Sequence, residues 1–111
     1  MSQLTLNDYQ KAAAETAIYP RTAAVTYPTL GLCGEAGEVA EKVKKAVRDD
    51  GGSIGESRRA ELGKELGDVL WYLSNLAADL GFNLADVAQG NLDKLASRAA
   101  RGKLQGSGDN R

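Results

Sequence analysis

Four carboxylates form two equally spaced pairs and are the first candidates for metal binding. Glu35 and Glu38 are three residues apart, and so are Glu65 and Asp68. Residues three apart lie on one face of an α-helix. Crowded carboxylates repel one another unless a cation lies between them, and oxygen ligands without imidazole or thiolate suit Mg²⁺ or Mn²⁺. The spacing predicts a divalent-metal site, provided that two helices bring the pairs together.

The absence of histidine narrows the chemistry further. The chain contains no histidine, and Cys33 is its only cysteine. This excludes an imidazole base, the usual zinc sites, and Ser-His or Cys-His nucleophiles. No Gly-x-x-x-x-Gly-Lys-Ser/Thr motif is present, which excludes a P-loop. Spacing alone leaves open a plainer reading, in which the acids are solvated helix faces and Glu38 forms a surface ion pair with Lys42.

Two long helices are expected to carry the acidic pairs. Apolar periodicity predicts helices over residues 29–48 and 58–80. Their apolar stripes consist of Leu32, Ala36, Val39, Val43 and Val47, and of Leu62, Leu66, Val69, Leu73, Leu76 and Leu80. The acidic pairs flank these stripes, so packing the stripes together would let the pairs meet. Recurrent glycines favour a close approach of the two helices: Gly31, Gly34, Gly37, Gly63 and Gly67.

Two further helices complete the expected fold, which is an all-α, four-helix bundle-like protomer. One covers about 6–19, with Thr5 as N-cap and Asp8 in place of the capping-box Glu. The other covers about 84–100 and follows Asn83 as N-cap. Ser57 is the expected N-cap of the third helix, and residues 20–28 and 49–57 are expected to be connectors.

Length and composition indicate one small domain and restrict the classes of partner that it could bind. The 111 residues fit a single domain over 1–101 with a flexible tail over 102–111. So small a core favours completion by a homodimer or homotetramer. A net charge of -1 disfavours binding to DNA or RNA polymers. No apolar run predicts a membrane span, and the single cysteine and the lack of a secretory signal favour a cytoplasmic location.

Several other residues are expected to have structural rather than chemical roles. Cys33 is expected to be small and buried, because nothing nearby would partner a reactive thiol. Trp71 lies off the apolar stripe, and packing at a subunit contact is favoured over stacking on a base. Core or rim packing is likewise favoured for Tyr9, Tyr19 and Tyr27.

Four segments resemble the MazG-like family of all-α nucleoside triphosphate pyrophosphohydrolases. The main ones are Gly31–Lys42 and Glu65–Tyr72, supported by Leu6–Gln10 and Asn91–Arg98. The similarity covers about residues 4–101. Many relatives have a further Glu just before the first acid of the motif, where this chain has Gly34, so its first motif has one carboxylate fewer.

The resemblance implies Mg²⁺-dependent cleavage of a nucleoside triphosphate into a monophosphate and pyrophosphate, as nucleotide-pool house-cleaning. It implies metal binding by four carboxylates: Glu35, Glu38, Glu65 and Asp68. Glu38 is the first candidate to activate water, and Glu35 is the second. Phosphate contacts are expected from Lys42, Lys94 and Arg98, whereas Asn91 would bind sugar, base or phosphate.

Two other functions remain open from the sequence. One is a helical oligomer that binds a nucleotide or a partner protein without catalysis, with the acids structural. The other keeps the metal chemistry but acts on another phosphoanhydride, such as a nucleotide alarmone. Metal-dependent release of pyrophosphate would separate these functions from hydrolysis of nucleoside triphosphates.

Overall fold

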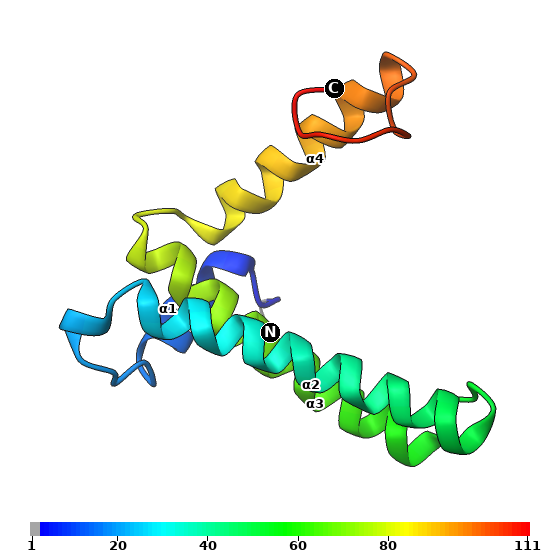
Figure 1. Ribbon diagram of the computed structural model, residues 1–111. Helices are drawn as coiled ribbons and strands as arrows, with labels where there is room; N and C mark the ends of the chain where they lie inside the picture. The colour runs from blue at the N-terminus through cyan, green and yellow to red at the C-terminus, as the bar shows by residue number, and fades with distance from the viewer. Residues whose placement is uncertain (1–2) are drawn as a thin grey trace.

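The computed structural model describes residues 3–111, and within them every regular element is helical. The elements are α1 (Leu6–Ala14), a short 3₁₀ helix (Arg21–Ala23), α2 (Thr26–Asp50), α3 (Glu56–Asp79) and α4 (Leu84–Ala100). Figure 1 shows α2 and α3 side by side as a long hairpin, with α1 near its open end. The all-α expectation with four main helices is confirmed.

Helix α1 begins as expected but ends early. The Thr5 hydroxyl accepts a hydrogen bond from the Asp8 backbone N–H at 3.0 Å, and Asp8 accepts one from the Thr5 N–H at 3.1 Å. This is a complete capping box. The helix ends at Ala14 instead of Tyr19, so the second half of that prediction is wrong. Thr16 hydrogen-bonds the Ala13 carbonyl at 3.0 Å, which offers that carbonyl a side-chain partner in place of the helical N–H.

The next two helices also begin before their expected first residues. Helix α2 begins at Thr26 and contains Pro28, which is tolerated because N–H groups of the first turn have no helical partner. The expected connector over 20–28 is therefore shorter and includes a 3₁₀ turn. Gly55, not Ser57, is the N-cap of α3, so Ser57 lies inside its first turn. Asn83 is the N-cap of α4, as expected.

One glycine sets the approach of α2 to α3. The Tyr72 ring occupies the space that a side chain at Gly31 would need. By contrast, a Cβ atom at any of the other four glycines singled out above, which are Gly34, Gly37, Gly63 and Gly67, would meet nothing within 4 Å. The expectation that all five serve a close approach is therefore wrong, and only Gly31 does so within this chain.

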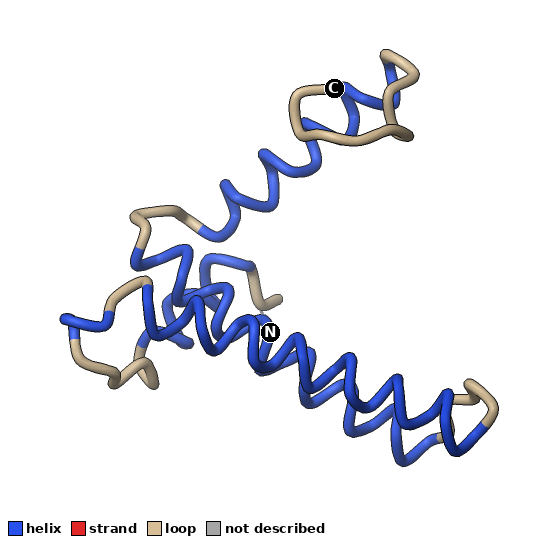
Figure 2. The backbone as a smooth tube through the Cα atoms, in the orientation of Figure 1, coloured by secondary structure: helices blue, strands red, loops and turns tan. Residues whose placement is uncertain are grey.

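The protomer is open, with a small core. Its buried apolar side chains are Ala13, Tyr19, Pro28, Ala46, Ala77 and Leu84. The radius of gyration is 16.9 Å, whereas a compact chain of this length would have about 13 Å. Figure 2 shows α4 as an arm that points away from the α2–α3 hairpin. The expected apolar stripes are only partly covered, because six of their residues remain exposed: Ala36, Val43, Val47, Leu66, Leu73 and Leu80.

Side chains of α1 attach the arm to the rest of the chain. The Gln10 side chain accepts from the Leu84 N–H at 3.0 Å and donates to the Phe82 carbonyl at 2.9 Å. The Asn7 side chain accepts from the Ala85 N–H at 3.0 Å. These bonds satisfy N–H groups at the start of α4, a task that Asn83 was expected to perform but does not. Helix α1 therefore caps α4 from outside.

The connector between α1 and α2 is held by one buried carboxylate. Asp79 accepts hydrogen bonds from the Tyr19 hydroxyl at 2.6 Å, from Arg21 at 2.9 Å and from the Val25 N–H at 3.0 Å. Val25 has a φ of 68°, in the left-handed region that β-branched residues avoid. The contact with Asp79 at the end of α3 thus fixes the residue from which α2 starts.

Candidate active site

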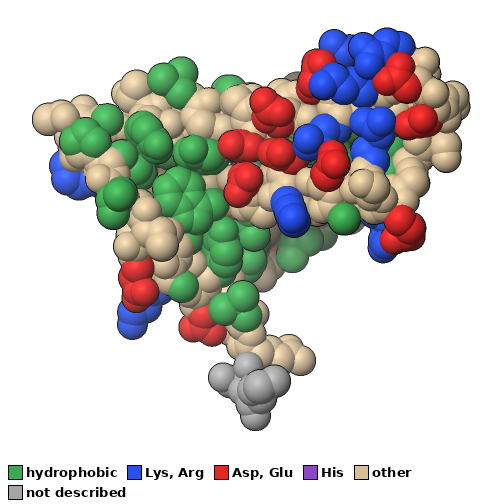
Figure 3. Space-filling model, turned by 90° about the horizontal axis from the view of Figure 1, so that it is seen from below, with side chains coloured by type: hydrophobic (Ala, Val, Ile, Leu, Met, Phe, Trp, Pro, Cys, Tyr) green, Lys and Arg blue, Asp and Glu red, His purple; other side chains and the backbone are tan. Residues whose placement is uncertain are grey.

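Three carboxylates from α2 and α3 form a cluster, which we call the acidic triad. One oxygen each from Glu35, Glu65 and Asp68 lies within 4.8 Å of the others. Glu35 and Glu65 are half-buried, whereas Asp68 is exposed. Figure 3 shows acidic side chains gathered between a hydrophobic area and an end rich in lysine and arginine. The packing of the two helices therefore brings together residues from both expected acidic pairs.

The electrostatics of the triad favour a bound cation. The pKa of Glu35 is raised from 4.5 to about 7, chiefly by hydrogen bonding to Glu65 and then by desolvation. The negative charges of Glu65, Asp68 and Glu38 add to this effect. At neutral pH Glu35 is therefore protonated in only part of the molecules. A divalent cation bound by these oxygens would remove the repulsion and displace the proton.

Glu38 lies beside the triad rather than within it. Its side chain is exposed, and it is not a member of the three-carboxylate group found among residues 3–111. Its charge nonetheless contributes to the raised pKa of Glu35. Spacing of three residues placed both acids on one face of α2, but it did not determine which side chain turns toward α3.

Lys42 adjoins the triad, and sequence reasoning missed its principal partner. The Lys42 ammonium lies 3.5 Å from a Glu61 carboxylate oxygen and 4.0 Å from one of Glu65. Arg58 donates to the Lys42 backbone carbonyl at 3.1 Å and so adds a second cation at this end of the hairpin. Glu61 precedes Glu65 by one helical turn, and that spacing was the available signal.

The three expected substrate-binding residues of α4 lie on the arm that points away from the hairpin (Figure 1). Asn91 lines an apolar groove between α3 and α4, next to Leu70 and Val87. Lys94 and Arg98 form ion pairs with Asp109 of the C-terminal tail, at 3.2 and 3.3 Å. A single chain therefore brings Lys42, but not this group from α4, to the acidic triad.

Aromatic side chains border the triad on the side of the α1–α2 connector. Tyr19 and Tyr27 stack with ring centroids 4.7 Å apart, and Tyr72 lies 6.2 Å beyond Tyr27. Burial is the main cause of the raised pKa of Tyr72, and the charges of Glu35 and Asp68 contribute to it. Tyr72 was not singled out from the sequence, although it follows the second acidic motif directly.

The other aromatic residues and the cysteine agree only in part with what the sequence predicts. Tyr19 is buried and Tyr9 is half-buried, as expected for core or rim packing, whereas Tyr27 is exposed. The Trp71 indole N–H donates to the Thr16 hydroxyl at 2.8 Å, so this side chain has a partner within the chain. Cys33 is exposed, and the expectation that it is buried is wrong.

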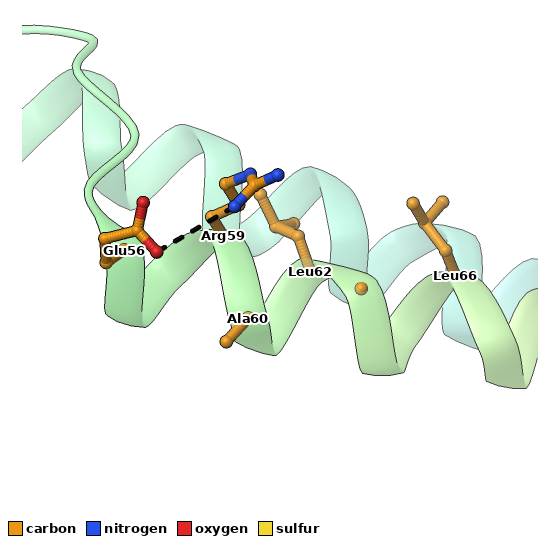
Figure 4. A pocket seen from close by; sticks show the side chains of 6 residues that line it. Glu56, Arg59, Ala60, Leu62 and Leu66 are labelled. Carbon is orange, nitrogen blue, oxygen red and sulfur yellow. Dashed lines mark ion pairs between the residues drawn. The ribbon is translucent and has the colours of Figure 1, made fainter.

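A separate hollow runs along the outer side of α3 (Figure 4). Leu62 and Leu66 line it, and a 3.8 Å ion pair between Arg59 and Glu56 lies at one end. It contains none of the three clustered carboxylates. This hollow is therefore a surface of one helix and not part of the candidate site.

Fold and site together define an all-α protein whose helical hairpin holds a carboxylate cluster suited to a divalent cation. The family model for the MazG nucleotide pyrophosphohydrolase domain matches residues 26–102, and the chain belongs to that family. This range contains the triad, Lys42 and all of α4. The resemblance noted in the sequence is thereby confirmed.

A phage protein is similar over nearly the whole chain. The gene 37 protein of Mycobacterium phage L5 is 52% identical over 109 residues, which cover 93% of this chain and 96% of the relative. No solved structure matches the chain. Within residues 3–111, none of the helices has both the length and the apolar character that crossing a membrane requires.

Proposed function

We propose that this protein hydrolyses nucleoside triphosphates to nucleoside monophosphates and pyrophosphate in a Mg²⁺-dependent reaction that controls the nucleotide pool. The observation that carries the proposal is the convergence of Glu35, Glu65 and Asp68 within 4.8 Å in a chain of the MazG family. Family membership supports a nucleotide pyrophosphohydrolase. The triad supports the dependence on metal.

The donor set fits a hard divalent cation. All three clustered groups are carboxylates, and the charges of Glu65 and Asp68 contribute to the raised pKa of Glu35. Oxygen ligands of this kind suit Mg²⁺, with Mn²⁺ as the alternative. When bound, such an ion neutralises phosphate charge and lowers the pKa of a coordinated water molecule. Glu35, Glu65 and Asp68 would hold it, with Glu38 as a fourth ligand or as a base beside it.

Glu38 is the residue we assign to orienting and deprotonating the attacking water. It is exposed and borders the triad without joining it, so it is the carboxylate with the most freedom to accept a proton. Glu35 is the second candidate. Lys42 would exchange its contacts with Glu61 and Glu65 for phosphate oxygens, since an ammonium group donates in several directions.

We also propose a homodimer or homotetramer, because one chain leaves the site incomplete. Asn91, Lys94 and Arg98 would reach an acidic triad from the arm of another copy. An apolar face on α3, α4 and the turn between them supports this assembly, and it consists of Leu70, Leu73, Leu80, Phe82 and Val87, all exposed. So large an exposed apolar surface is typical of an interaction site.

The catalytic domain would extend over residues 1–101, beyond the matched family range. Helix α1 lies before that range, yet Gln10 and Asn7 hydrogen-bond the start of α4. Removal of α1 would therefore expose unpaired N–H groups on the arm. The cytosol remains the expected compartment, on the ground of the single cysteine.

The proposal is tested by measuring pyrophosphate release from the common ribo- and deoxynucleoside triphosphates. Each substrate is assayed with Mg²⁺, with Mn²⁺ and with chelator. We expect metal-dependent release by the wild type and its loss in Glu38→Ala and Asp68→Ala at unchanged helix content. Glu41→Gln is the matched control, since Glu41 lies on α2 but pairs with Lys44 and Lys45.

Three outcomes would contradict the proposal. Pyrophosphate release without metal would show that the triad has no role in the reaction. Full activity of Asp68→Ala would show that the site is assigned to the wrong residues. No release from any triphosphate would favour a non-catalytic nucleotide- or partner-binding oligomer, or hydrolysis of another phosphoanhydride such as an alarmone.

A further inference from the structure

Arg98 is a buried cation on the last turn of α4. Only 4% of the residue is exposed, although charged side chains are rarely buried unless they are paired. Its guanidinium donates to the Asp109 backbone carbonyl at 2.7 Å and to the Asp109 carboxylate at 3.3 Å. The same carboxylate lies 3.2 Å from the Lys94 ammonium, one helical turn earlier. One residue of the tail thus bridges both cations.

The tail folds back onto α4 to place Asp109 there. Gly102, Gly106 and Gly108 have φ values of 67°, 106° and 86°, which let the chain reverse its direction without strain. The Lys103 N–H donates to the Arg98 carbonyl at 2.6 Å. Arg111 closes the loop by donating to backbone carbonyls at residues 103, 104 and 108. Figure 1 shows this loop in red against the end of the arm.

Asp109 satisfies the two cations incompletely. The Nε atom of Arg98 is buried and has no hydrogen-bond partner within the described residues. A buried donor without a partner is unfavourable, and a guanidinium can offer two parallel N–H groups to one oxyanion. A phosphate group has more oxygens than a carboxylate. It can accept hydrogen bonds from Lys94 and from both the Nε and the terminal N–H groups of Arg98. The Asp109 side chain is 82% exposed, so nothing traps it in place.

We propose that the Asp109 carboxylate occupies the phosphate site of Lys94 and Arg98 as a displaceable internal competitor. The inference rests on the phosphate-binding role of these two residues in the proposed function. The tail then limits access of phosphate groups to the arm until it is displaced. Displacement exchanges one carboxylate for a ligand of higher charge on the same cations.

The test uses inorganic pyrophosphate and the full chain in chelator, so that no metal at the acidic triad contributes to binding. Calorimetry compares the wild type with Asp109→Asn, which removes the competing charge and keeps the backbone carbonyl. We expect pyrophosphate to bind about threefold to tenfold tighter to the variant, the range that loss of one or two exposed ion pairs gives. Lys94→Gln should weaken binding in both backgrounds.

A matched control separates competition from general electrostatics. Asp93→Asn removes one negative charge from the neighbouring residue, whose side chain accepts a bond from Gln89 and touches neither cation. Its pyrophosphate affinity should equal that of the wild type. If Asp93→Asn tightens binding as much as Asp109→Asn, or if Asp109→Asn changes nothing, the competitor role is wrong.

A second readout distinguishes a competitor from a structural cap. In amide NMR spectra, pyrophosphate should move the Gly106 and Gly108 signals of the wild type toward disordered positions. Binding that leaves these signals in place, or no binding by either protein, would overturn the inference. Failure of the proposed function is separate, because tail displacement by pyrophosphate in a chain that hydrolyses no triphosphate would leave the inference standing.

Discussion

The ring of Tyr72 fills the space beside Gly31 where any other residue would place its side chain. This contact links the two helices that carry the acidic triad, since Gly31 is one turn before Glu35 and Tyr72 is one turn after Asp68. The separation of α2 and α3, and with it the distance between the carboxylates, therefore depends on the absence of a side chain at position 31.

Gly31→Ala is expected to destabilise the protein. The methyl group must displace the Tyr72 ring, and such overpacking costs about 1–3 kcal/mol. A gain of about 1 kcal/mol in helix propensity offsets part of this. Gly34→Ala is the matched control on the same helix, because a Cβ atom there meets nothing within 4 Å, and it should stabilise the protein. Urea unfolding measures the free energy of unfolding of both variants. Equal effects of the two substitutions would contradict the close contact between Gly31 and Tyr72.

Glu35→Gln should change both the pH dependence of stability and the activity. Because folding raises the pKa of Glu35 from 4.5 to about 7, the folded state binds more protons than the unfolded state between these values. The stability of the metal-free wild type should therefore fall as pH rises from about 4.5 to 7. Glu35→Gln should lose this pH dependence of stability. Its kcat/KM should also fall by about 100-fold or more, a larger loss than is typical when a residue that only hydrogen-bonds a metal ligand is replaced.

Thermal unfolding in chelator across this pH range measures the slope for both proteins. A wild type whose stability rises with pH in the same window would show that the triad does not concentrate negative charge. Added Mg²⁺ should flatten the slope, because a cation would compensate the carboxylates.

Asp79→Asn is expected to lower stability by about 1–3 kcal/mol, the usual cost of disrupting buried hydrogen bonds. Burial alone would raise the pKa of Asp79, but the bonds from Tyr19, Val25 and Arg21 outweigh it and lower the pKa below 3.8. The stability from these bonds is thus present above pH 3.8 and is lost as pH falls through the lowered pKa.

Acid unfolding compares Asp79→Asn with the wild type and with Glu15→Gln, an exposed acid of the same connector. The Asp79 variant should show a smaller loss of stability at low pH, whereas Glu15→Gln should follow the wild type. Identical acid transitions for all three proteins would refute the role of Asp79.

Leu73→Asp should disrupt the proposed assembly. Leu73 is 36% exposed on the apolar face, where a second copy would bury it and desolvate the new charge. Ile54→Asp is the matched control, since Ile54 is 41% exposed but lies in the connector at the closed end of the hairpin. Light scattering should give a multiple of 11.7 kDa for the wild type and the control, and 11.7 kDa for Leu73→Asp. A monomeric wild type would contradict the proposal.

Local signals explain why much of the fold could be predicted. Helix α4 has the expected bounds, because Gly81 with a φ of 82° separates it from α3 and Asn83 occupies its N-cap position. Three of the four paired acids converge because each pair flanks an apolar stripe on helices that pack side by side. These features depend on periodicity and on the ends of helices, which neighbouring residues determine.

Distant partners explain what the sequence could not supply. Helix α1 ends near Thr16, whose hydroxyl accepts from Trp71, 55 residues further along the chain. The direction of α4 depends on Gln10, which bonds Phe82 and Leu84 more than 70 residues away. The exposure of Cys33 depends on which side of α2 is left uncovered. None of these contacts leaves a mark in local residue spacing.

The left-handed conformation of Val25 has a consequence for engineering the protein. A β-branched residue at a φ of 68° and a ψ of −53° is strained by about 1–3 kcal/mol, and Asp79 holds it there through its N–H. Glycine would adopt the same backbone angles with little strain and would keep the N–H. Among the non-glycine positions described, this is the one with positive φ, so a screen for heat-resistant variants should recover substitutions at position 25 early.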